Sequence, residues 1–145
     1  MPEPVAKVRA RHALKTIEDF VPTDGRKQVI GNYVSYVKGL PANILSNGLG
    51  QAMAMEAMGA SKDTGHRLLC RHMNIWLLGE RGSDLFPRVP DAGTPPPENQ
   101  PARLVAMLTH AGATQDDYVR AQAEALAYLD WLKKFAVALL SEAAK

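Results

Sequence analysis

The chain has 145 residues, of which 46% are hydrophobic and 22% charged, a balance typical of a folded globular protein. Its net charge of +2 excludes the strong basicity expected of a stand-alone nucleic-acid binder. The charge is uneven, since residues 1–72 carry ten Lys and Arg against six Asp and Glu. A lone cysteine, Cys70, excludes an intramolecular disulfide. With no apolar signal region and no membrane-length apolar run, we expect a soluble, cytoplasmic protein with no membrane partner.

Apolar residues recur at three- and four-residue spacing along nearly the whole chain. This pattern predicts an all-α fold, a compact single-domain bundle of about five to six helices spanning residues 1–145. The first helix is predicted over roughly residues 3–20, and after a break at residues 22–25 either Thr23 or Asp24 would cap the second. Gly39-Leu40-Pro41 is expected to end that second helix, because the residue before a proline is driven out of the helical region.

A third helix is predicted over residues 42–58, with two glycines in its middle, Gly48 and Gly50. Glycine weakens a helix interior, so these positions need an explanation. We favour a close contact with a neighbouring helix, and the alternative is a kink or break near Asn47-Gly48. A fourth helix is predicted over residues 61–78, opened by Ser61.

Residues 79–101 contain most of the prolines of the chain, and we expect no regular element there but a mobile loop. A short helix is then predicted over residues 102–110. The last helix should begin at Thr114, which can cap it, while Asp116 and Asp117 place negative charge beside its positive end. Its broad apolar face makes it the expected centre of the core.

Two groups of residues invite a chemical interpretation. His66, Cys70 and His72 resemble metal ligands, but at 100° per residue His72 points about 160° away from Cys70, so the three cannot converge. A buried thiol and two partly packed imidazoles are predicted instead. Asp116 and Asp117 diverge on their helix, and capping explains both. The sequence therefore predicts no catalytic residue, no metal site and no cofactor.

Basic residues recur on two helices. Lys7, Arg11 and Lys15 lie four residues apart on one face of the first helix, and Arg67 and Arg71 do the same on the fourth. Such spacing lets successive charges follow a phosphate backbone, although a solvated surface gives the same pattern. These five residues are candidate phosphate contacts.

Trp131 falls near the polar side of the last helix, together with Arg120 and Glu124. An exposed tryptophan is a favoured anchor in protein interfaces, so Trp131 is a candidate interface residue. The alternative is that another helix or the proline-rich loop covers it.

Two stretches carry a family resemblance, Tyr33 to Met55 and Tyr118 to Ala136. The first has a tyrosine and a lysine before Leu-Pro, then an isoleucine, then Asn-Gly-Leu-Gly, at Tyr36, Lys38, Leu40-Pro41, Ile44 and residues 47–50. The second has the block Tyr-Leu-Asp-Trp-Leu-Lys at residues 128–133. Together they resemble the small (Cmr) subunit of type III-B CRISPR effector complexes.

This resemblance implies a non-catalytic subunit in antiviral defence whose copies stack head to tail as a minor filament. Its implied partners are the large subunit, the backbone subunits, guide RNA and target RNA. Lys38 and Lys133 lie in the matching blocks and are the first candidates for phosphate contact, followed by Lys134. The competing hypothesis is a helical protein-interaction adaptor with no RNA role. It would use Trp131 and the side that carries Met53, Met55 and Met58.

Overall fold

The computed structural model describes residues 2–20 and 27–144, and every regular element in these ranges is helical. The elements are α1 (Val5–Glu18), α2 (Lys27–Ala60), α3 (Thr64–Asn74), the π-helical η1 (Ile75–Glu80), α4 (Gly82–Leu85), α5 (Arg103–Leu108), α6 (Gln115–Leu140) and the short 3-10 turn η2 (Glu142–Ala144). The all-α prediction is confirmed. The break predicted at residues 22–25 and its caps Thr23 and Asp24 lie outside the described ranges. No described helix is both long and apolar enough to cross a bilayer.

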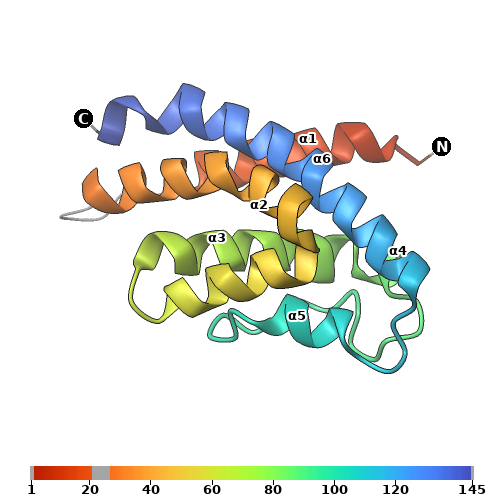
Figure 1. The fold of residues 1–145 in the computed structure, drawn as a ribbon. Coiled ribbons are helices and arrows are strands. Elements are labelled where there is room, and N and C mark those ends of the chain that lie inside the picture. The colour runs from red at the N-terminus through yellow and green to blue at the C-terminus, as the bar shows by residue number, and fades with distance from the viewer. Residues whose placement is uncertain (1, 21–26, 145) are drawn as a thin grey trace.

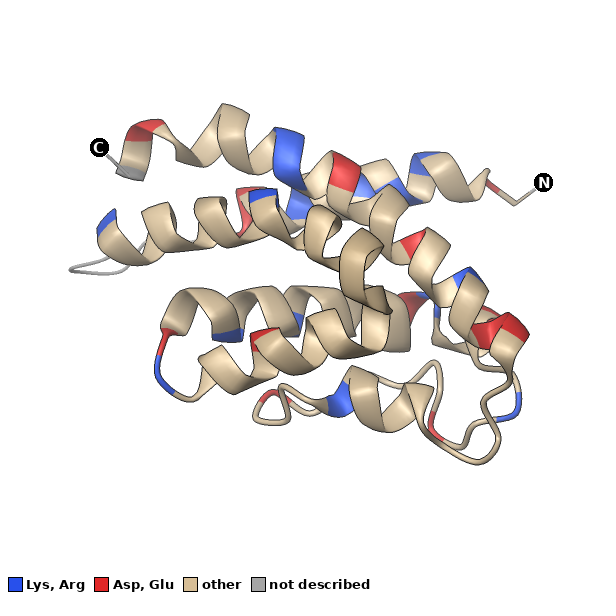
Figure 2. Cartoon of the chain, viewed as in Figure 1, with Lys and Arg blue, Asp and Glu red and all other residues tan. Residues whose placement is uncertain are grey.

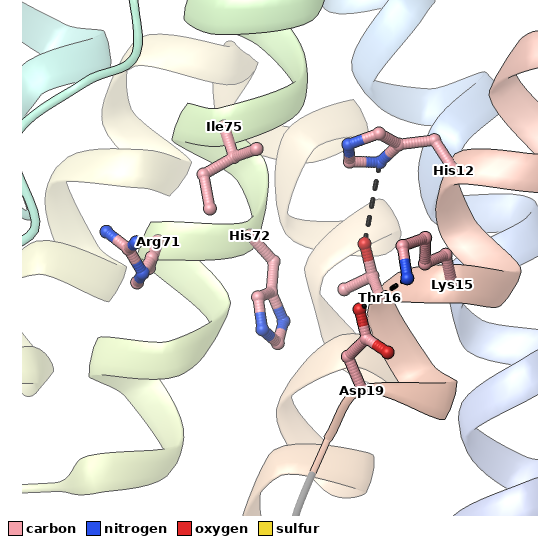
Figure 3. Close-up of a pocket in the computed structure, with 7 residues that line it drawn as sticks. All are labelled: His12, Lys15, Thr16, Asp19, Arg71, His72 and Ile75. Carbon is pink, nitrogen blue, oxygen red and sulfur yellow. Dashed lines mark hydrogen bonds and ion pairs between the residues drawn. The ribbon is translucent and has the colours of Figure 1, made fainter.

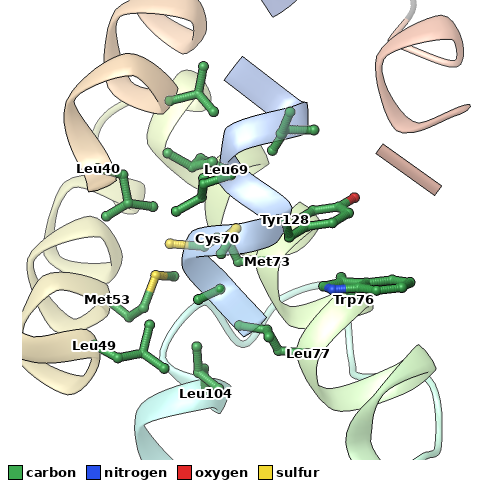
Figure 4. Close-up of a cluster of buried hydrophobic side chains, with 14 of the residues drawn as sticks. Leu40, Leu49, Met53, Leu69, Cys70, Met73, Trp76, Leu77, Leu104 and Tyr128 are labelled. Atoms are coloured by element: carbon green, nitrogen blue, oxygen red, sulfur yellow. The ribbon is translucent and has the colours of Figure 1, made fainter. Parts of the chain in front are cut away.

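The helices form two layers (Figure 1). The upper layer holds α1, α6 and the first half of α2, while the second half of α2 lies with α3 in the lower layer, above α5. Accordingly, α2 packs on both α3 and α6, and α1 packs along α6. The core lies where these helices meet, and Figure 4 shows Met53, Leu69, Trp76 and Tyr128 in it, all fully buried. The predicted central position of the last helix is confirmed.

Helix α2 runs without interruption through Gly39-Leu40-Pro41, so the prediction that these residues end a helix is wrong. Pro41 removes one backbone donor from the helical ladder. Burial offsets that loss, because Val37, Leu40 and Ile44 on the turns around the proline are all buried in the core. Tertiary packing here overrides the local preference.

The real break in α2 lies at Gly48, whose backbone is non-helical with φ 85° and ψ 158°. The two explanations offered for the glycines, a close contact with a neighbouring helix and a break in the helix, both apply at this position. A Cβ on Gly48 would lie 2.9 Å from the Tyr118 hydroxyl, so the close contact with α6 is present as well. That hydroxyl accepts from the Gly50 N–H at 2.8 Å, and the Gln122 side chain accepts from the Leu49 N–H at 2.9 Å. The amides that the break frees are thus satisfied by α6.

Helix α3 begins after Asp63 and not at Ser61, because the Asp63 carboxylate accepts from the N–H groups of Gly65 and His66. It continues as a π-helical turn to Glu80, two residues beyond the predicted end. A π-helical turn is rare and widens the helix locally. This continuation delivers the buried Trp76 to the core.

The proline-rich segment contains one turn of helix, α4, so the expectation that it holds no regular element is wrong. Leu85, Phe86 and Val89 from this segment are buried in the core, and this packing supports a turn that ends just before the first proline, Pro87. Its predicted mobility stays a prediction. At α6 the predicted cap is confirmed, since the Thr114 hydroxyl and the Asp117 carboxylate each accept from the other residue's backbone N–H.

Candidate nucleic-acid interface

The three lysines named from the family resemblance meet at one groove. Lys38 from α2 faces Lys133 and Lys134 from α6, and Val137 and Ala138, one turn further along α6, complete a hollow of about 430 Å³. Residues three and four apart share a helix face, so α6 offers both lysines and their apolar neighbours together. We call this hollow the lysine groove. The sequence placed these lysines in separate blocks, and the fold brings them side by side.

The cations of the lysine groove are only lightly neutralised. Lys38 and Lys133 make no ion pair within residues 2–20 and 27–144. Lys134 pairs with Asp130 at 3.1 Å, but both side chains are exposed, and a surface pair of this kind contributes only about 0.3–0.5 kcal/mol. An incoming phosphate can therefore displace Asp130 from Lys134 at little cost in free energy. The groove offers positive charge without a competing buried carboxylate.

The basic stripe of α1 is exposed but already paired. Lys7 and Arg11 both contact the Glu3 carboxylate, and Lys15 pairs with Asp19 at 3.1 Å. Figure 2 shows acidic segments interleaved with the basic ones along this layer. The predicted spacing is present, while phosphate contact by these three residues stays a prediction.

Arg67 and Arg71 do not join the lysine groove. Arg67 donates from Nε to the Ala60 carbonyl at 3.3 Å, and Arg71 pairs with Glu98 of the proline-rich segment at 3.1 Å. The Arg71 Nη1 is buried and has no hydrogen-bond partner among the described residues. Both arginines are thus occupied by the protein itself, and their phosphate contact also stays a prediction.

A hollow of about 270 Å³ between α1 and α3 gathers two histidines (Figure 3). Burial lowers the pKa of His72 to about 3, so its ring is neutral, and a hydrogen bond of 2.6 Å joins Nδ1 to the Tyr33 hydroxyl. Burial also lowers the pKa of His12. Lys15, on the wall of this hollow, is paired with Asp19. Arg71 also lines the hollow and is paired with Glu98. Neutral imidazoles beside two paired cations give little attraction for a phosphate.

The residues that resembled a metal site lie with separate neighbours. His66 contacts the Glu56 carboxylate and stacks on the Tyr36 ring at 3.6 Å between centroids. Cys70 is fully buried, and burial raises its pKa to about 12, so the thiol is protonated near neutral pH. The predicted buried thiol is confirmed.

Trp131 is 38% exposed. Its ring stacks on Phe135 at 5.6 Å, and the Lys134 ammonium lies 5.9 Å from its centroid. Arg120 and Glu124 were predicted to share the polar side of the helix with Trp131. Arg120 is exposed, but Glu124 is buried against α1. The interface role of Trp131 stays a prediction.

A charged cluster that the sequence did not reveal surrounds Glu124. The hollow is about 260 Å³ in volume, and its lining is Arg9, Arg81, Leu85, Arg120, Ala123 and Glu124. We call it the arginine pocket. The Glu124 oxygens accept from Arg9, Arg81 and the indole of Trp76. The three arginines come from distant parts of the chain, so no spacing joins them. The sequence gives one sign of this cluster, the acidic residue Glu124 directly before the apolar position Ala125 on the last helix.

Electrostatics keep this cluster ionised. Burial opposes the charge on Glu124, but the hydrogen bonds from Arg9 and Trp76 prevail and hold its pKa below the ordinary value. The bond to Glu124 in turn raises the pKa of Arg9. A buried carboxylate with this many donors stays charged because each donor favours the ionised form. The cluster therefore ties α1, α6 and the end of η1 together.

Fold and surface define an all-helical protein that presents a cationic groove between two helices. The family model described as CRISPR-associated protein (Cas_Cmr5) matches residues 5–139, nearly the whole chain, and the chain belongs to this family. The family is that of the small subunit of type III-B Cmr complexes, so the resemblance seen in two sequence blocks is confirmed. The chain is thus a subunit of a CRISPR-associated Cmr complex.

Proposed function

We propose that the chain is the non-catalytic small subunit of a type III-B effector in antiviral defence, and that it holds backbone phosphates of guide or target RNA in the lysine groove. Its copies stack as a minor filament beside the large subunit and the backbone subunits in the cytoplasm. The observation that carries the RNA contact is the convergence of Lys38, Lys133 and Lys134 from two helices. Lys38 and Lys133 lie in the two family blocks, and Lys134 directly follows the second.

Charge and geometry support a sequence-independent contact. Lysine binds phosphate as a flexible point charge, and the groove is shallow and lined partly by Val137 and Ala138. Such a surface follows a backbone without reading bases. The small net charge of the chain fits a subunit that binds RNA through repeated copies, since each copy adds its contact to the same strand.

Charge reversal in the groove tests this function. The double variant Lys38→Glu with Lys133→Glu is expected to weaken RNA binding by the assembled effector complex. Each lost phosphate contact lowers the salt dependence of single-strand binding by about 0.7 in the logarithmic slope, so two contacts per subunit lower it by about 1.4. Binding is measured with labelled single-stranded RNA over a series of salt concentrations.

The matched control reverses two exposed lysines away from the groove, Lys27→Glu with Lys62→Glu, and changes the net charge equally. The proposal requires the groove variant to lose much more affinity than this control. Equal losses would mean that overall charge, and not the groove, governs binding. Unchanged affinity and slope would remove Lys38 and Lys133 from the interface.

The adaptor hypothesis keeps one structural argument. Met55 and Met58 are exposed on α2 and line neither the lysine groove nor the arginine pocket, whereas Met53 is buried in the core and cannot join a docking surface. Binding of the other subunits without any retention of RNA would favour this hypothesis over ours.

A further inference from the structure

Three arginines from three parts of the fold surround one small hollow. Arg9 comes from α1, Arg81 follows η1, and Arg120 lies on α6, with Glu124 as the carboxylate between them. The arginine pocket shares no residue with the lysine groove. It is therefore a second cationic feature with its own chemistry.

The guanidinium groups are held in place before any ligand arrives. Arg9 and Arg81 are each only 18% exposed and are bound to Glu124. Arg120 donates to the carbonyls of Asp84 at 2.7 Å and Leu85 at 3.3 Å. Because these side chains are already ordered, binding to them loses little conformational entropy. Rigid guanidinium groups are also the preferred partners of planar carboxylates.

The pocket retains unused donors. Glu124 is saturated, since each of its oxygens already accepts two hydrogen bonds. Nη1 of Arg9 and Nη2 of Arg81 make no hydrogen bond to the described residues, and neither belongs to the buried atoms that lack a partner. Both nitrogens are therefore accessible from outside. An incoming acceptor can bind to these two nitrogens without displacing Glu124.

The lining of the pocket is cationic, because it carries three arginines and one carboxylate, Glu124. Arg81 and Arg120 also pair with Asp84 and Asp117, which lie outside the lining. A carboxylate that enters the hollow therefore meets more positive than negative charge in the lining. The hollow is small, so it suits a single inserted group better than an extended strand.

We propose that the arginine pocket receives the carboxylate of an acidic side chain projecting from a neighbouring protein subunit. The carboxylate accepts from Arg9 Nη1 and Arg81 Nη2. The inference rests on the proposed role as an effector subunit and adds the chemistry by which a protein partner is recognised. It assigns protein contact to one end of α6 and RNA contact to the other.

A carboxylate built into the pocket tests the inference. Ala123 lines the pocket and is exposed, so Ala123→Glu places an internal competitor beside the arginines, and Ala123→Gln adds the same bulk without the charge. Glu and Gln have similar helix propensities, so the pair is matched. The probe is the effector assembled without this subunit, to which the fluorescently labelled chain is added.

We expect Ala123→Glu to weaken association at least about tenfold, as loss of a charged hydrogen bond does, and Ala123→Gln to weaken it far less. Thermal melting of the isolated variants should show both folded, with Ala123→Glu no less stable than wild type. Equal losses in both variants, or none in either, would overturn the inference.

RNA binding separates this inference from the proposed function. The corresponding carboxylate in the lysine groove, Ala138→Glu, is expected to weaken RNA binding and leave subunit association intact. Ala123→Glu should do the reverse. If Ala123→Glu instead lost only RNA, the pocket would be a phosphate site and the inference wrong, while failure of Ala138→Glu alone would count against the lysine groove.

Discussion

Two charged regions of α6 differ in what surrounds their carboxylates. Glu124 in the arginine pocket is buried, 4% exposed, and fully hydrogen-bonded, whereas Asp130 beside the lysine groove is 57% exposed and holds one lysine. In the first region the charges are part of the fold, because none can leave without stranding the others. In the second they sit on the surface and are free to exchange partners. Cations near a carboxylate therefore need not have the same role.

The largest expected effect comes from neutralising the buried carboxylate. Glu124→Gln leaves Arg9 without its counter-charge and Arg81 with Asp84 alone, and loss of one partner from a buried pair typically costs about 3–5 kcal/mol. Asp130→Asn is the matched change in the other region and should alter the free energy of unfolding by less than about 0.5 kcal/mol. Urea denaturation measures both. Similar values for the two variants would show that the buried and the exposed carboxylate contribute equally to stability.

Acid should also separate buried from exposed groups, because the buried imidazole of His72 is neutral in the folded protein. Since burial lowers the pKa of His72 to about 3, the unfolded chain binds a proton below about pH 6.5 that the native chain does not. Stability is therefore full above that pH and falls on acidification, by up to about 1.4 kcal/mol per pH unit until native His72 itself titrates.

Removal of the imidazole should flatten this dependence. His72→Asn retains a polar group that can hydrogen-bond to the Tyr33 hydroxyl but cannot titrate, so its unfolding free energy should fall less steeply with acid. His110→Asn, at an exposed position, serves as the comparison. Denaturation curves between pH 7 and 4 give the slopes, and parallel slopes for wild type and His72→Asn would contradict the assignment.

The smallest effect is expected at the surface. Lys134→Ala loses its exposed pair with Asp130 and its contact with the Trp131 ring, together worth about 0.5–1 kcal/mol at low salt. Raising the salt concentration should reduce the difference from wild type, since screening weakens exposed charges. Lys133→Ala, which has no ion pair in the described part of the chain, should show no such salt effect.

Helical periodicity was enough to predict the fold class and the central place of α6, because buried positions recur along each helix. Local rules failed at Pro41, where burial of Leu40 and Ile44 keeps the helix intact. They were incomplete at Gly48, since only the structure shows that Tyr118 and Gln122 support the break. Interactions between distant segments decided both outcomes.

The same limit applies to the candidate site. Lys38, Lys133 and Lys134 were found through the family resemblance, and the fold then placed them together. The arginine pocket joins positions 9, 81, 120 and 124, which share no pattern along the chain. Contacts of this kind become visible only when tertiary structure brings the residues together.

The break at Gly48 also bears on how the protein is made. Its two freed amides find their acceptors on Gln122 and Tyr118, 73 and 68 residues further along the chain. A ribosome adds roughly 5–20 residues per second, so α2 emerges several seconds before the residues that secure its bend. The nascent chain therefore holds α2 without its final angle until α6 has been synthesised, and the two-layer arrangement is completed last, from the C-terminal side.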